Sequence, residues 1–405
     1  RTLDPFVRRT YGKNAKQIKT KRGNVDWYEW RAEDGRKVFA TISGSVIVFG
    51  NDEKQIEIVP NAIINGTVGD EKIIAATDSL SDSLAYGVVF GKGIKNAADI
   101  VGVSTAVRQS NDENSRGIIS GIVPSLLKNL IKRITWTMKK TDSGVNDTVH
   151  FELKREAAEV LQLNLKQGNG DFSEMMRVLP QNFSYVTKYD LSDARIAYRT
   201  IVLTAAHNVD QIKPEAVMLA SNWLLKPYGI EKPEMFLESV APQIITGAVD
   251  DAGMESFVIA KVRDVKLLQN SLSSDGRFSD DKKTWETPDG IVLVQNGELV
   301  LLGEKRVVEQ IIGETEKRGN SRTSAENAEV NTVAFKQFIA TKGVAVTLSF
   351  DKTLPQKIAN TFAKDSNVLE KTYEIRTTTF TNEGVVRTYD SQFGFIGYFI
   401  AQLVQ

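Results

Sequence analysis

The chain has 405 residues, enough for two or three domains that each bury a hydrophobic core. Its 51 basic residues balance 51 acidic residues, so the overall charge favours neither nucleic acid nor an acidic membrane as a partner. The absence of cysteine excludes disulfides, thiolate nucleophiles and cysteine-containing metal sites. Two histidines, His150 and His207, do not suggest a metal site, and no cofactor is expected.

No apolar run reaches the roughly 18 residues that span a bilayer. The chain starts at Arg1 rather than Met, as expected of a mature exported protein whose leader was removed, or of an incomplete chain. Export is therefore a hypothesis at this point.

Basic residues dominate the N-terminal segment, before the aromatic residues Trp27, Tyr28 and Trp30. We predict a basic arm that faces solvent or a partner, because such charge clusters are usually interaction surfaces. Binding of nucleic acid or anionic lipid is the alternative, although Trp27 would point away from Tyr28 and Trp30 on a strand. The candidate partner-binding residues are Arg8, Arg9, Lys13, Lys16, Lys19, Lys21 and Arg22.

Alternating apolar residues predict strands at 26–32, 37–42 and 45–49, separated by the turns Asp34-Gly35 and Ser43-Gly44. A helix is predicted from residue 51 or 52 to 59. Further along, Gly91-Lys92-Gly93 follows an apolar run but matches no phosphate-binding spacing, so it indicates a turn from strand to helix.

A second hairpin is predicted at 134–154 around Asp142-Ser143-Gly144, followed by a helix at 155–167. His150 is expected on the polar side of this hairpin, with Thr148 and Glu152. A strand at 183–189 and a helix at 214–225 follow, and the segments 104–115, 271–283 and 313–331 indicate loops.

The segment 202–207 is similar to the one that carries the catalytic histidine of chymotrypsin-like proteases. That family also needs a glycine-rich nucleophile loop downstream, and none follows His207; Ser143 precedes it and lies in a predicted turn. The acidic pairs Asp250-Asp251 and Asp280-Asp281 match no calcium loop and are expected in solvated turns. We therefore predict no catalytic residue.

Two segments of the chain repeat. Residues 291–303 repeat the pattern of 38–50 with both turn glycines aligned, and 373–391 repeats the hairpin of 134–154. The first copy has fewer residues before its meander than the second. We predict two tandem copies, residues 1–167, shortened at the N-terminus, and residues 168–405.

The residues 44–53, their echo at 297–304, Leu179-Pro180 and the closing segment 393–397 resemble a family of uncharacterised exported bacterial proteins. The resemblance implies envelope-associated, noncatalytic domains and supplies no site residues. It also implies a periplasmic or envelope location; the cytoplasm is the alternative.

The predicted fold is α+β, with a mainly antiparallel sheet and helices packed on one face in each copy. The expected function is that of a noncatalytic binding or scaffold protein of the bacterial cell envelope, acting with protein partners. The alternatives are a hydrolase whose site is assembled only by folding, and a binder of nucleic acid or anionic lipid through the basic arm.

Overall fold

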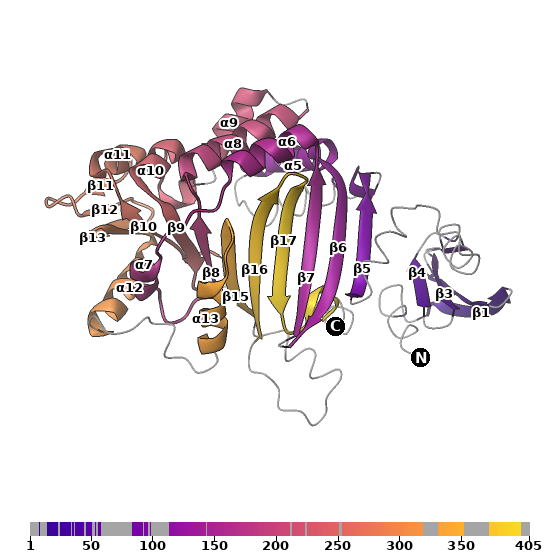
Figure 1. Cartoon of the computed structure of the whole chain (residues 1–405). Helices are drawn as coiled ribbons and strands as arrows, with labels where there is room; N and C mark the ends of the chain where they lie inside the picture. Colours follow the sequence, from indigo (N-terminus) through magenta and orange to yellow (C-terminus); the bar gives the residue numbers. More distant parts are fainter. Residues whose placement is uncertain are drawn as a thin grey trace. The chain divides into compact units, whose positions relative to one another are not determined.

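The computed structural model describes two compact units of the chain (Figure 1). The first comprises residues 1–83, 356–367 and 395–405, and the second residues 84–355 and 368–394. The predicted boundary between the copies, at residue 167, thus lies inside the second unit. The described residues are 8, 14–22, 25–33, 35, 37–43, 46–50, 53, 56–57, 83–91, 93–95, 98, 113–142, 144–210, 213–222, 225–250, 253–318, 331–351 and 372–397.

An antiparallel four-stranded sheet forms the described part of the first unit. Its strands follow the chain in the order β1 (Lys16–Arg22), β2 (Val25–Arg31), β3 (Lys37–Ser43) and β4 (Val46–Gly50). The three predicted strands correspond to β2, β3 and β4. Gly35 occupies the first predicted turn with a φ of 85°, a value that glycine adopts without strain. The alternation of apolar residues does not predict β1, and most of the predicted helix at 51–59 lies outside the described residues.

A 13-stranded sheet organises the second unit, and every pairing with a printed register in it is antiparallel. Its order is β11-β12-β13-β14-β10-β9-β8-β15-β16-β17-β7-β6-β5. In chain order the strands are β5 (Ser83–Phe90), β6 (Ile131–Thr141), β7 (Gly144–Leu153), β8 (Tyr185–Asp190), β9 (Val240–Ala248), β10 (Ser256–Val262), β11 (Arg277–Phe278), β12 (Thr284–Glu286), β13 (Ile291–Asn296), β14 (Leu299–Glu304), β15 (Ala345–Asp351), β16 (Thr372–Thr381) and β17 (Gly384–Ser391).

Side-chain caps and proline fix the starts of several helices. Asp193 accepts a hydrogen bond from the amide of Ile196, and Asp264 one from the amide of Leu267, each satisfying a donor that the first helical turn leaves free. The helices are α5 (Glu113–Leu130), α6 (Arg155–Asn164), α7 (Ser173–Arg177), α8 (Ala194–Asn208), α9 (Pro214–Asn222), η1 (Lys226–Tyr228, 3-10), α10 (Pro233–Ser239), α11 (Val265–Ser271), α12 (Lys305–Arg318) and α13 (Asn331–Ala340). No described helix is both long and apolar enough to cross a membrane.

Two hydrophobic cores lie on opposite faces of the large sheet. Neighbouring residues of one strand point to opposite faces, and Ile244 belongs to one core while Ile245 belongs to the other. The first core packs α7, α12 and α13 against the sheet, and the second packs α8, α10 and α11. The α+β class with mainly antiparallel sheets is confirmed, but helices on one face only is wrong here, because both faces of β9 and β10 are apolar and need a cover.

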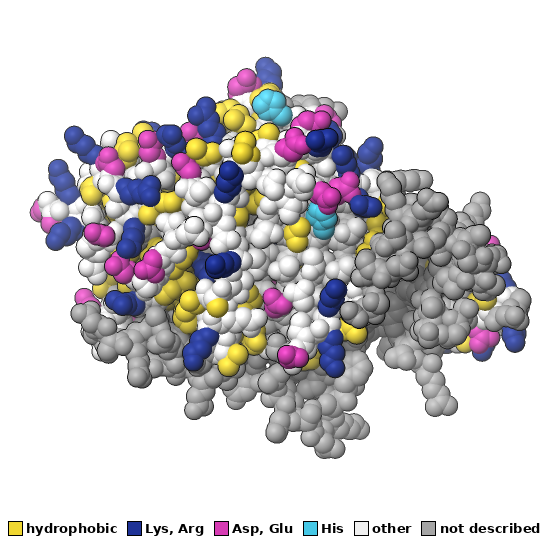
Figure 2. Space-filling model, viewed as in Figure 1, with side chains coloured by type: hydrophobic (Ala, Val, Ile, Leu, Met, Phe, Trp, Pro, Cys, Tyr) yellow, Lys and Arg dark blue, Asp and Glu magenta, His cyan; other side chains and the backbone are white. Residues whose placement is uncertain are grey.

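The central hairpins β6–β7 and β16–β17 confirm both predicted hairpins. One of their faces contributes Leu153 to a third core beneath α6 and α8. The other face carries many threonines, and uncharged side chains and backbone (white) fill the middle of the view in Figure 2. Described helices therefore cover one face of these hairpins, whereas the other face is polar.

Candidate functional site

The described part of the predicted basic arm is largely the strand β1. Arg9 and Lys13 lie outside the described residues, and Arg8 is half-buried in a helical conformation. The other predicted partner-binding residues, Lys16, Lys19, Lys21 and Arg22, are exposed on β1. β1 pairs along its whole length with β2, so these exposed side chains project from a strand.

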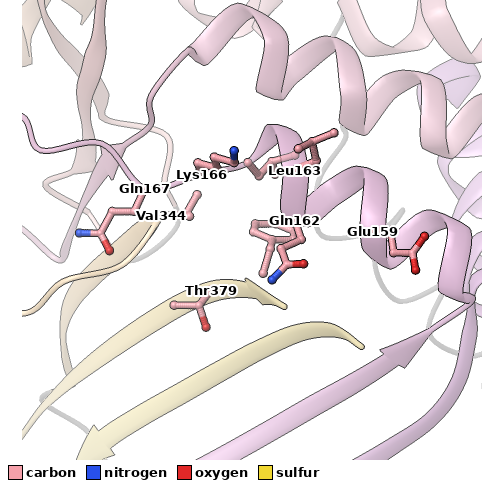
Figure 3. A pocket seen from close by; sticks show the side chains of 9 residues that line it. Glu159, Gln162, Leu163, Lys166, Gln167, Val344 and Thr379 are labelled. Carbon is pink, nitrogen blue, oxygen red and sulfur yellow. The ribbon is translucent and has the colours of Figure 1, made fainter. Parts of the chain in front are cut away.

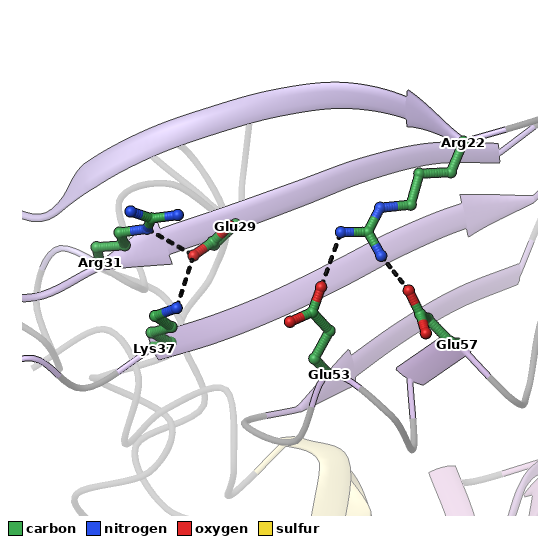
Figure 4. Close-up of polar contacts among 6 residues, drawn as sticks. All are labelled: Arg22, Glu29, Arg31, Lys37, Glu53 and Glu57. Atoms are coloured by element: carbon green, nitrogen blue, oxygen red, sulfur yellow. Dashed lines mark hydrogen bonds and ion pairs between the residues drawn. The ribbon is translucent and has the colours of Figure 1, made fainter.

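Ion pairs engage part of the positive charge of β1. Arg22 bridges Glu53, at 2.8 Å, and Glu57 (Figure 4), and its guanidinium carbon lies 4.0 Å from the ring centroid of Trp27. Lys19 pairs with Asp26 at 3.3 Å. Such exposed pairs stabilise a fold weakly, but they reduce the field that an anionic partner would meet.

The aromatic residues beside β1 do not form an exposed stacking surface. Trp27 is buried with Phe39, and Trp30 is buried in a separate cluster that includes Tyr28. The predicted opposite orientation of Trp27 is confirmed. Both tryptophan side chains are buried in the cores of the small sheet, so neither ring is exposed for stacking on a nucleic-acid base.

His207 lies in the last turn of α8, where its Nδ1 is 2.7 Å from the carbonyl oxygen of Leu203. The side chain is exposed and bonds within its own helix, which does not support a role as a protease base. Ser143 lies outside the described residues. His150 is half-buried between Thr135 and Val386 rather than fully exposed, and its Nε2 is buried without a hydrogen-bond partner.

Acidic residues in the described turns accept hydrogen bonds from backbone amides and from neighbouring hydroxyl groups. Asp250 accepts hydrogen bonds from the amides of Met254 and Glu255, and Asp281 accepts one from the hydroxyl of Ser279. The Ser279 hydroxyl lowers the pKa of Asp281, as the Ser173 amide lowers the pKa of Asp171. A general acid would need the opposite shift. Among the described residues, no group of three or more metal-ligating side chains occurs.

The turn after β5 confirms the strand-to-helix reading of Gly91-Lys92-Gly93, since Gly91 and Gly93 are helical. Lys92 lies outside the described residues.

A hollow of about 610 Å³ lies between α6 and the ends of β15 and β16. Figure 3 shows Gln162 projecting from α6 toward the strands, with Thr379 on β16 beneath it. Leu163 and Phe380 supply apolar lining, and Glu159 and Lys166 supply opposite charges. This lining offers hydrogen bonds and apolar contact but no nucleophile beside a base.

The outer edge of β5 is the most distinctive exposed feature. β5 ends the large sheet, and no described strand pairs with its outer side. Leu84 is 58 % exposed, Val89 41 % and Phe90 48 %. Gly87 makes room for the ring of Trp136 on β6, since a Cβ there would lie 3.0 Å from that ring. The strand is thus held by β6 on one side, while no strand of the described part of the chain pairs with its other edge.

The opposite end of the sheet lacks these properties. β11 has two residues, Arg277 and Phe278, and turns with charged residues surround it. Short, charged edges discourage pairing with another chain, whereas long apolar edges favour it.

Comparison of the chain with protein-family models, curated proteins and solved structures found no match. The sequence signals the apolar run of β5 but not its position at the edge, which depends on strand order. The exposed edge of β5 can therefore be identified only from the fold.

Proposed function

We propose that the protein is a noncatalytic binding or scaffold protein of the bacterial cell envelope that binds an extended segment of a partner polypeptide along the outer edge of β5. The observation that carries this proposal is the open eight-residue end strand with exposed Leu84, Val89 and Phe90. The unpaired N–H and C=O groups of such an edge bind a further strand, and alternate side chains of that strand give specificity.

A tandem duplication, which we propose for residues 1–167 and 168–405, supports the choice of partner. The hairpins β3–β4 and β13–β14 keep one register across a separation of 253 residues, because Phe39 pairs with Gly50 and Val292 pairs with Gly303. Both hairpins occupy the end of a meander of the same strand order, β1–β4 and β11–β14.

The central hairpins support the same proposal with a separation of 240 residues. Thr141 pairs with Gly144, and Thr381 pairs with Gly384. β7 pairs antiparallel with β17 so that Thr148 faces Thr388, which is its equivalent in the other copy. The order β16-β17-β7-β6 is therefore the one expected if a local twofold axis passes between β7 and β17.

If this proposed symmetry continues outward, β5 is the equivalent of β15. β5 lies next to β6, and β15 lies next to β16. The ring of Trp136 on β6 lies next to Gly87, and Arg376 on β16 pairs with Thr347. Trp136 and Arg376 are related by the separation of 240 residues between β6 and β16. Leu348 then corresponds to Val88.

In the proposed second copy, β8 lies next to β15 at the position that no described strand occupies next to β5. β15 pairs on its other edge with β8, antiparallel, so that Leu348 faces Val186 and Ala345 faces Tyr189. We therefore propose that the partner segment pairs antiparallel with residues 85–89. It should have the pattern of β8, with an apolar residue opposite Val88 and bulky residues at the outer positions.

A synthetic peptide with the sequence of residues 183–191 tests this function. Titration of the labelled peptide into the chain, followed by fluorescence anisotropy, should show saturable binding. The double variant Leu84→Lys/Val89→Lys should weaken it at least tenfold, about 1.4 kcal/mol, because ammonium groups replace the apolar contacts of the added strand.

A matched control is Leu219→Lys/Val265→Lys. Leu219 is 64 % exposed and Val265 42 % exposed, close to the values for Leu84 and Val89, but both lie on helices. This variant should bind the peptide like the wild type. Equal weakening by both double variants, or no binding to the wild type, would contradict the function.

The envelope location rests on the sequence resemblance alone. Cell fractionation with an antibody against the chain checks it: recovery with periplasmic or membrane fractions is expected, and recovery only with the cytoplasm would count against it.

A further inference from the structure

A pocket of about 520 Å³ lies on the face of the large sheet that carries α7, α12 and α13. Its walls are the segment 167–173, strand β8 and the segment 339–343 at the end of α13. Figure 1 shows α7, β8 and α13 beside one another. The volume lies in the range of small-molecule sites.

Lys188 of β8 lines the pocket although only 6 % of it is exposed. Its Nζ donates a hydrogen bond of 2.7 Å to the carbonyl oxygen of Ile339 and lies 5.3 Å from the ring centroid of Phe338. Burial lowers the pKa of Lys188 to about 8, although Asp190 opposes the shift. An ammonium has three donors, and the bond to Ile339 uses one of them.

Asp190 lines the same pocket and is 8 % exposed. Its Oδ1 accepts hydrogen bonds from the amide of Gly170, at 3.1 Å, and from Nε2 of Gln243, at 3.3 Å. Its Oδ2 accepts none from the described residues. A buried carboxylate normally uses more than one of its oxygens.

The two charged groups are close but do not pair. Lys188 and Asp190 are two residues apart on β8 and share a face, which separates their Cα atoms by roughly 7 Å. No ion pair joins them, although each is desolvated and the opposite charge would compensate the other. A molecule with an acceptor at one end and a donor at the other would bridge them.

Gly168 and Gly170 allow the loop of residues 167–173 to lie close to Asp190. A Cβ on Gly168 would lie 2.6 Å from Oδ1 of Asp190, and a Cβ on Gly170 would overlap the side chain of Gln243. Only a loop without side chains at these positions can approach so closely. The loop therefore fixes the orientation of the carboxylate toward the pocket.

We propose that this pocket binds a small molecule of the amino-acid or hydroxy-acid class, whose carboxylate is held by Lys188 and whose amine or hydroxyl donates to Asp190. This site is separate from the edge of β5 and does not depend on the proposed function. Arg177 and Lys342 also line the pocket, against Asp171. Three basic and two acidic side chains suit a ligand with one negative group better than a multiply charged phosphate.

Four probes of similar size separate the two contacts. L-alanine and L-lactate carry both groups, propionate carries only the carboxylate, and isopropylamine carries only the amine. Ligand-observed NMR by saturation transfer should show that L-alanine or L-lactate binds at least tenfold more tightly than propionate and isopropylamine. Equal binding of propionate, or binding of inorganic phosphate alone, would overturn the proposal.

Variants assign the contacts. Lys188→Met and Asp190→Asn should each weaken binding of the preferred probe at least tenfold, whereas Lys266→Met, at an exposed lysine of α11, should leave it unchanged. Full binding by Lys188→Met or Asp190→Asn would overturn the proposal.

A measurement on the wild-type chain removes any dependence on the folding of Lys188→Met. Acetic anhydride at pH 8, followed by mass spectrometry, should acetylate Lys188 and the exposed Lys266, and the preferred probe should protect Lys188 but not Lys266. Lack of acetylation, or acetylation that the probe does not change, would show that the pocket does not admit a small molecule at Lys188.

Discussion

Strands β5 and β15 are both apolar, both lie next to a long central hairpin, and differ in their second neighbour. β15 lies between β8 and β16, and its Val346 and Leu348 are fully buried in the core beneath α13. Among the described strands β5 pairs with β6 alone, and three of its large side chains are substantially exposed. The difference shows that an apolar strand is buried in a core or exposed at an edge according to which strands pair with it.

The largest expected effect is the difference in the free energy of unfolding between a substitution in β15 and one in β5. Leu348→Ala should lower the free energy of unfolding by about 2–5 kcal/mol, because it leaves a cavity in a closed core. Leu84→Ala should change it by about 0.5 kcal/mol or less, because the side chain is already in contact with water. Urea unfolding measures both, and equal losses would show that the edge of β5 is covered.

The turns of the central hairpins give the next test. Gly144 and Gly384 have φ values of 153° and 148°, and a Cβ on each would overlap a backbone carbonyl oxygen of the other hairpin. Gly144→Ala and Gly384→Ala should each cost about 1–3 kcal/mol in urea unfolding.

Gly290→Ala is the control for these turns. Its φ is 80°, but no atom lies within 4 Å of the added Cβ, so it should cost only about 1 kcal/mol. A large loss at Gly384 with none at Gly144 would break the symmetry between the hairpins.

Lys188 lies on β8, the strand next to β15, and should make the free energy of unfolding depend on pH. Burial lowers the pKa of Lys188 on β8 to about 8 in the fold, whereas the ordinary pKa of a lysine in the unfolded chain is 10.5. Since the unfolded chain then binds more protons, the free energy of unfolding should rise by about 1–2 kcal/mol between pH 8 and 10. Below pH 8 the cost of the buried charge is fully present.

Comparison with Lys188→Met isolates this group, because other residues titrate alike in both chains. The wild type should gain stability relative to the variant as the pH rises. A parallel pH dependence of the two chains in urea unfolding would contradict the shifted pKa.

The smallest effect is expected on β1. Arg22→Ala should lower the free energy of unfolding by about 0.5–1 kcal/mol, because the side chain bridges two carboxylates and covers Trp27. Lys16→Ala should have almost no effect, since Lys16 is exposed and forms no ion pair with the described residues. Thermal unfolding at low and high salt distinguishes them: only the Arg22 loss should shrink with salt.

The sequence predicted what depends on local pattern. Alternation and turn glycines gave the hairpins around Gly144 and Gly384 and the strands on either side of Gly35. It did not predict α5, which contains Pro124, nor the extension of α12 to Arg318 through a segment expected to be a loop. The polar residues after Gly313 concealed the end of α12, whereas in α5 two glycines and Pro124 lower the intrinsic helix propensity of an otherwise apolar segment.

The candidate sites depend on long-range pairing and were correspondingly harder to predict. The sequence predicts a strand at 183–189 but not the burial of Lys188, because that burial depends on α13 and on the loop at Gly170. The binding role predicted for the basic residues of β1 rests on their charge alone. The sequence does not show that Arg22 pairs with Glu53 and Glu57, because these contacts depend on the fold.

Amide hydrogen exchange, with and without the peptide of residues 183–191, tests the central claim most directly. The account predicts that the peptide slows exchange at the amides of residues 84–90 in the wild type, and that it does not do so in Leu84→Lys/Val89→Lys. Unchanged exchange in β5, or protection confined to β15 because the peptide replaces β8, would contradict it.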